Sequence, residues 1–95
     1  MAKTTSFSRF TLGRAIRRQR EKLGLSQEDF AERANVHRTY ISSIELGKVS
    51  MGIEVAHSLA SALGMKLSEL VRKAEQGHNA RRRSDGAKSF RLVRP

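Results

Sequence analysis

Residues 27–46 contain the pattern of two short helices that cross at a sharp turn, and this pattern restricts the fold more than any other feature of the chain. Small or apolar residues recur at helical spacing through its first half, and Ala31 is small enough for a second helix to cross close to the backbone. Asn35 follows, and asparagine tolerates the left-handed backbone conformation that such a turn needs. The segment therefore predicts helices at about 27–34 and 37–46.

The residues that flank these two helices fit the same prediction. Ser26 can cap the first helix through its hydroxyl, with Asp29 completing a capping-box arrangement, and Gly47 ends the second helix. In the second helix, Ile41 and Ile44 are three residues apart and predict a buried face. The side chains expected on the outward face are Arg38, Thr39, Ser42 and Ser43.

Three further helices are predicted around this pair, at about residues 10–23, 53–63 and 67–75. Gly24 and Gly64 stand just after two of them, as expected of helix stops. The apolar faces expected to share one core contain Leu12, Ile16, Leu23, Val55, Leu59, Leu63, Leu67, Leu70 and Val71. The predicted fold class is therefore all-α, with five helices and no strands.

The run GLSQEDFAERANVHRTYISSIELGK resembles the helix-turn-helix of the Xre family, the lambda-repressor-like and Cro-like regulators of phages and bacteria. The similarity extends from about Phe10 to Ala74, so it implies a compact five-helix lambda-repressor-like DNA-binding domain. Asn35 stands where glycine is usual in the turn, and VSMG at 49–52 replaces a loop that typically contains Asn-Pro-Ser or Thr. The segment RTYIS at 38–42 is also similar to the controller proteins of restriction–modification systems.

The charge of the chain points to nucleic acid as its partner. Nineteen Lys and Arg residues against nine Asp and Glu give a net charge of +10, as expected of a protein that neutralises phosphates. Residues 77–95 hold six basic side chains, one acidic side chain and few apolar ones, too few to fold alone. We expect a flexible segment at 1–9, one DNA-binding domain at 10–76 and a flexible basic tail at 77–95.

Enzymatic and membrane functions are not indicated. His37, His57 and His78 lie about twenty residues apart without the spacing of a zinc or catalytic cluster, so no metal, cofactor or catalytic residue is expected. The chain lacks cysteine, a signal peptide and any apolar run long enough to cross a membrane. A cytoplasmic protein without membrane contact is expected.

The second helix of the motif, 37–46, is expected to lie in the major groove of double-stranded DNA with its N-terminal residues toward the base edges. Arg38 can donate two hydrogen bonds to guanine, and the alternative is a surface arginine that contacts phosphate only. Thr39 is expected to contact a base through its hydroxyl or methyl group. Ser42 and Ser43, one turn later, can reach bases or phosphates.

Five further residues are expected to contact DNA phosphates. Gln27 opens the first motif helix, and similar regulators use this glutamine to hold a phosphate at the positive end of the helix dipole. Lys48, Arg17 and Arg18 are phosphate candidates by position and charge. Tyr40 is expected to pack its ring at the helix junction and direct its hydroxyl to a phosphate.

Arg20 and Glu45 have a different expected role. In Xre-like domains, the arginine at this place resembles one that pairs with the glutamate at the end of the recognition helix. The resemblance therefore implies a structural ion pair between Arg20 and Glu45.

These observations predict a sequence-specific transcriptional regulator that occupies a promoter or operator as a homodimer, because one small domain makes few base contacts. The apolar face of the fifth helix would serve equally as a dimer seam or as core. One alternative is an antitoxin that binds DNA and also a protein partner through Phe90, Leu92 and Val93 of the tail. Another is sequence-independent nucleic-acid binding through the arginine run at 81–83.

Overall fold

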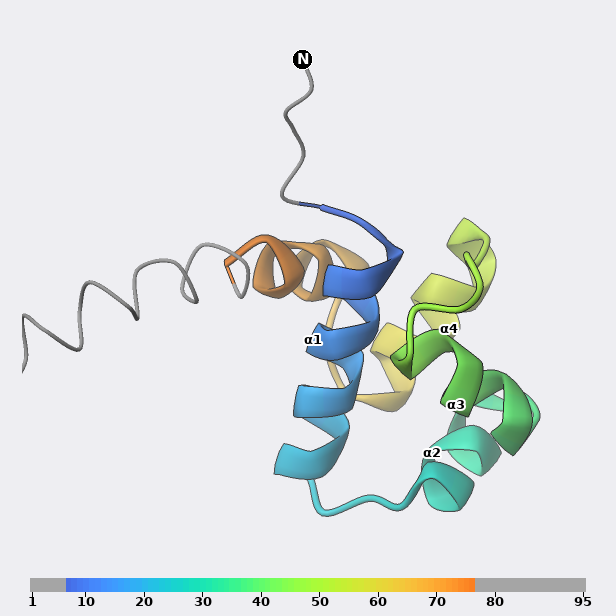
Figure 1. Ribbon diagram of the computed structural model, residues 1–95. Helices are drawn as coiled ribbons and strands as arrows, with labels where there is room; N and C mark the ends of the chain where they lie inside the picture. Colours follow the sequence, from blue (N-terminus) through green and yellow to red (C-terminus); the bar gives the residue numbers. More distant parts are fainter. Residues whose placement is uncertain (1–6, 77–95) are drawn as a thin grey trace, which may run out of the picture.

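The computed structural model describes residues 7–76, which form five helices (Figure 1). In chain order they are α1 (Arg9–Lys22), α2 (Gln27–Ala34), α3 (Arg38–Glu45), α4 (Ile53–Ala62) and a fifth helix over residues 67–76. No strand occurs in this part of the chain. Every helix begins within one residue of its expected position and α1 to α4 also end within one residue of it, so the all-α prediction is confirmed. The basic tail expected at 77–95 lies outside the described residues.

Two serine caps fix where the first two helices begin. The Ser8 hydroxyl accepts hydrogen bonds from the backbone N–H groups of Phe10 and Thr11, at 3.2 and 3.3 Å. The Thr11 hydroxyl accepts one from the Ser8 N–H at 2.8 Å, so a capping box starts α1 one residue earlier than expected. At α2, the Ser26 hydroxyl accepts a hydrogen bond from the Asp29 N–H at 3.0 Å, which is one of the two bonds of the expected capping box.

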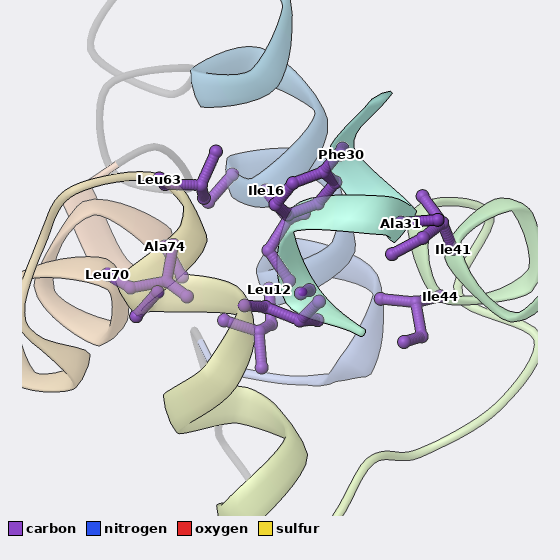
Figure 2. Close-up of a cluster of buried hydrophobic side chains, with 13 residues drawn as sticks. Leu12, Ile16, Phe30, Ala31, Ile41, Ile44, Leu63, Leu70 and Ala74 are labelled. Carbon is purple, nitrogen blue, oxygen red and sulfur yellow. The ribbon is translucent and has the colours of Figure 1, made fainter. Parts of the chain in front are cut away.

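The core is a single cluster to which all five helices contribute side chains (Figure 2). Its largest fully buried members are Phe30, Ile16, Ile41, Ile44, Leu59 and Leu70. The expectation that Leu23 belongs to this core was wrong, because α1 ends at Lys22 and Leu23 is its C-cap, with 52% of its surface exposed.

The apolar face of the fifth helix is used mainly by this core. Leu70 is fully buried and Ala74 is almost so, while Leu67 packs against the cluster from a half-buried position. Val71 is also half-buried. The core therefore covers Leu70 and Ala74, and leaves Leu67 and Val71 partly accessible.

Helix α3 packs against both α1 and α2, and α2 packs against α4. The approach of α1 to α3 is close at Gly13, where a Cβ atom would collide with the carbonyl oxygen of Ile44. Arg9 adds a hydrogen bond from its Nε to the carbonyl oxygen of Gly47 at 2.9 Å. The end of α3 is thus held against the first half of α1 by backbone contact and by a side-chain hydrogen bond.

Candidate nucleic-acid interface

The turn between α2 and α3 has the predicted geometry. Asn35 is the C-cap of α2 with left-handed angles φ 58° and ψ 47°. The Val36 N–H donates to the carbonyl oxygen of Ala31 at 3.0 Å, and the buried Ala31 lets the two helices pack closely. His37 is the N-cap of α3 and makes no side-chain capping bond. The first residue of α3 is therefore Arg38, whose side chain is exposed.

Helix α3 has one buried side and one accessible side. Ile41 and Ile44 have no solvent exposure and fix the helix on the core. The accessible side presents the four predicted base-contact residues, of which Arg38 and Thr39 are exposed and Ser42 and Ser43 are half-buried. The first turn of α3 is therefore the part of the helix that a base edge can reach most directly.

Tyr40 lies on the same helix but is half-buried and packs against the core. This position agrees with the packing role expected for its ring. A phosphate contact by its hydroxyl stays a prediction.

The outer face of α2 is negative. Glu28, Asp29 and Glu32 line a shallow groove that ends at His37 and Arg38. Because carboxylates repel phosphates, the DNA backbone is expected on the sides of α3 that face away from this groove. Arg38 is then the positive group at the border between the acidic face of α2 and the accessible side of α3.

The expected ion pair between Arg20 and Glu45 is present and buried. Arg20 donates from Nε to Glu45 Oε2 at 2.7 Å and from Nη2 to Oε1 at 3.1 Å, and from Nη1 to the carbonyl oxygen of Leu25 at 2.7 Å. The hydrogen bond to Glu45 is the main cause that raises the pKa of Arg20, and burial acts against it. The pair therefore ties the last turn of α1, the turn before α2 and the end of α3 together.

Gln27 joins the same network. Its amide Nε2 donates to Glu45 Oε1 at 3.1 Å, and its side chain is half-buried in the first turn of α2. An amide nitrogen carries two hydrogens, so one remains for a phosphate while the other holds Glu45. The structure thus places the predicted phosphate contact of α2 beside the C-terminal end of α3.

The remaining phosphate candidates occupy two places. Lys48 is exposed and directly follows Gly47, in the turn after α3. Arg17 and Arg18 lie on α1, where the Nε of Arg17 is 3.0 Å from a carboxylate oxygen of Glu21. Arg14, which was not among the predicted contacts, lines the same groove as Arg17 and Arg18. Arg14 lies three and four residues before Arg17 and Arg18, a spacing that places all three on one face of a helix and could have indicated their proximity.

Among residues 7–76, no three His, Cys, Asp or Glu side chains are grouped so that they could hold a metal ion. His78 lies outside this range. No helix in the described part of the chain is long and apolar enough to cross a membrane.

Comparison with known proteins adds to this geometry. The model of the HTH_3 helix-turn-helix family matches residues 16–70. The control protein C.MunI of a Mycoplasma species is 41% identical over 58 residues, which cover 61% of this chain and 78% of that protein. The control protein C.BamHI of Bacillus amyloliquefaciens is 34% identical over 68 residues, which cover 70% and 84% of the two chains.

A solved structure shows the same fold. The restriction–modification controller protein C.AhdI from Aeromonas hydrophila matches with a TM-score of 0.64 at 31% identity, over 65% of this chain and 94% of that chain. The matched family region runs from α1 into the fifth helix and includes the whole helix-turn-helix. Both the Xre-type resemblance and the expectation of a non-enzymatic regulator are confirmed by these relatives. The chain belongs to the HTH_3 helix-turn-helix family of DNA-binding transcription regulators.

Proposed function

We propose that this regulator recognises a specific operator or promoter sequence in double-stranded DNA with α3 in the major groove. The observation that best supports this is the division of α3 into a buried side with Ile41 and Ile44 and an accessible first turn with Arg38 and Thr39. The major groove admits a helix and presents a distinct pattern of donors and acceptors for each base pair. A helix fixed on a packed core can hold its first turn in one position against such a pattern.

Within this proposal, each residue has a defined part. Arg38 donates two hydrogen bonds to O6 and N7 of a guanine, a contact worth about 1–3 kcal/mol of discrimination. Thr39 contacts a neighbouring base, and Ser42 and Ser43 reach a base or the phosphate beside it. Gln27, Tyr40 and Lys48 contact phosphates, which set affinity and register but no base preference.

We further propose that the protein binds as a homodimer to two half-sites about 34 Å apart, since one domain of this size makes few base contacts. The half-buried Leu67 and Val71 are the large apolar side chains of the fifth helix that are still partly accessible to a second copy. The sequence identity with C.MunI, C.BamHI and C.AhdI favours the proposal that this protein is a cytoplasmic regulator of a restriction–modification operon.

The proposal is tested by selecting binding sites from a random duplex library at near-physiological salt with the intact chain, Arg38→Ala and Arg33→Ala. Arg33 is the matched control, because it is an exposed arginine that lines a different groove, between α2 and α4. We expect a two-fold-symmetric motif that loses its preference at one position per half-site only with Arg38→Ala. Failure of the folded intact chain to enrich any motif would refute specific recognition, and a motif unaffected by Arg38→Ala would refute the role of Arg38.

A further inference from the structure

A groove of about 450 Å³ lies between α1 and the C-terminal end of α3. We call it the α1–α3 groove, and besides Glu45 it is lined by Phe10, Arg14, Arg17, Arg18, Glu21 and Leu46. Figure 1 shows the two helices side by side, as their contacts require. The groove therefore combines three guanidinium groups with two large apolar side chains.

The charge of this groove is positive. Arg17 pairs with Glu21 at 3.0 Å, but Arg14 and Arg18 form no ion pair within residues 7–76. The carboxylate of Glu45 does not offset them, because it is buried and already accepts hydrogen bonds from Arg20 and Gln27. Two exposed arginines are therefore available to an anion in the groove.

The apolar wall of the groove has a fixed position. The ring of Phe10 lies directly against Gly47, and the Arg9 guanidinium sits over the ring with 5.4 Å to its centroid. Phe10 is nevertheless 55% exposed, and Leu46 across the groove is 54% exposed. An anion that also presents an apolar surface, such as a phosphate attached to deoxyribose, is complementary to this combination of side chains.

The place of the groove relative to α3 identifies the occupant. Helix α3 has eight residues and is thus about 12 Å long, comparable to the roughly 12 Å width of the major groove. A helix whose first turn meets base edges then brings its last residues close to the phosphates at the rim. The groove is lined by Glu45 and Leu46 at that end, next to Gln27, and it shares no lining residue with the acidic groove of α2.

We propose that the α1–α3 groove binds a backbone phosphate of the same duplex whose bases α3 contacts, with Arg14 and Arg18 as its ligands. Phe10 and Leu46 contact the adjoining deoxyribose, and Glu21 weakens the site because it repels the phosphate and holds Arg17. This inference rests on the proposed function, and to the phosphate contact already expected of Arg18 it adds Arg14 and the apolar contacts of Phe10 and Leu46.

The test measures the affinity of the full-length chain for the selected operator and for an unrelated duplex, as a function of salt concentration. The variants are Arg14→Gln and Glu21→Gln, with Arg33→Gln as the control that removes the same charge elsewhere. Loss of one phosphate contact lowers the salt slope by about 0.9, which corresponds to about an eightfold loss of affinity at 0.1 M salt relative to 1 M. We expect this loss for Arg14→Gln on both duplexes and no comparable change for Arg33→Gln.

Glu21→Gln provides a test in the opposite direction. Removing this carboxylate should tighten binding to both duplexes at low salt, and a gain of affinity cannot result from unfolding. If both groove variants match the control while the intact chain still selects an operator, the inference is wrong and the proposed function stands. If the intact chain selects no operator, specific recognition fails, and a reduced salt slope for Arg14→Gln would still support phosphate binding in the groove.

A second copy of the chain is the main competing occupant, since the acidic outer face of α2 would complement these arginines. A duplex with a single half-site separates the two cases. If Arg14→Gln changes the salt slope there, the groove binds phosphate. An effect confined to duplexes with two half-sites, together with a change in sedimentation of the free protein, would overturn the proposal.

Discussion

Replacing Arg20 with methionine should remove about 3–5 kcal/mol from the free energy of unfolding, because it leaves the Glu45 carboxylate buried without its cation. The side chain of Glu45 is 2% exposed and accepts hydrogen bonds at 2.7 and 3.1 Å from Arg20 and at 3.1 Å from Gln27. A domain of the described size, residues 7–76, has a total stability of roughly 4–10 kcal/mol. The variant should therefore lie close to its unfolding transition at room temperature.

The double variant Arg20→Met with Glu45→Leu distinguishes the energy of the ion pair from that of the other contacts of Arg20. Replacing a buried ion pair with apolar side chains is often close to neutral. The main remaining loss is the hydrogen bond to the Leu25 carbonyl, which measures 2.7 Å, and leaving that oxygen unpaired costs about 1–3 kcal/mol. We expect the double variant to be more stable than Arg20→Met alone by about 2 kcal/mol.

The assay is urea unfolding followed by far-ultraviolet circular dichroism. It compares the intact chain, Arg20→Met, Glu45→Leu and the double variant, with one common value for the dependence of the unfolding free energy on urea concentration. Coupling between the two residues is the difference between the double variant and the sum of the singles. If the two single losses simply add, the pair is not energetically coupled and the argument from burial is wrong. The double variant should also keep the operator preference of the intact chain, since neither residue contacts a base in our proposal.

Three further variants test local features of the fold by the same unfolding assay. Gly13→Ala should cost about 1–2 kcal/mol, because overpacking against Ile44 outweighs a gain of about 1 kcal/mol in helix propensity. Stabilisation would instead mean that α1 and α3 are farther apart. Asn35→Ala should cost about 1 kcal/mol and lower Tm by roughly 4–8 °C, since alanine resists the left-handed conformation, and an unchanged Tm would contradict that strain. Ser8→Ala should cost about 1 kcal/mol through loss of the capping box, and no loss would show that α1 does not depend on this cap.

The sequence predicts the helices and the turn well because their determinants are local. A serine before an apolar periodic run caps a helix, and a glycine after the run ends it. A left-handed asparagine between two runs forms the turn. Each of these residues affects the backbone only within a few residues of itself. The error at Leu23 arises because periodicity was extended past the end of the helix. The capping box at Ser8 was missed because threonine at Thr11 replaces the glutamate or glutamine that marks the usual pattern.

The contacts between α1 and α3 were less accessible from the sequence because they depend on tertiary packing. Gly13 gave one signal, since a glycine inside a helix is costly and its presence indicates a close neighbour. Position and charge alone predicted Arg17 and Arg18, but they did not reveal that Arg17 pairs with Glu21 or that Arg14 lines the same groove. Resemblance to a family supplied the pairing of Arg20 with Glu45, which no spacing in this chain would reveal.

The C-terminal end of α3 depends on α1 in two ways. A helix of eight residues is unstable alone, and its C-terminal end carries partial negative charge, to which Glu45 adds a full one. The helix therefore needs packing to be stable, and the negative charge at its end disfavours a nearby phosphate backbone. Helix α1 supplies the packing. It also offsets the charge, because Arg20 pairs with Glu45 and Arg9 donates a hydrogen bond to the carbonyl oxygen of Gly47. In our proposal, the negative end of α3 is neutralised in this way, so that the remaining arginines of α1 bind the DNA backbone while the first turn of α3 contacts the bases.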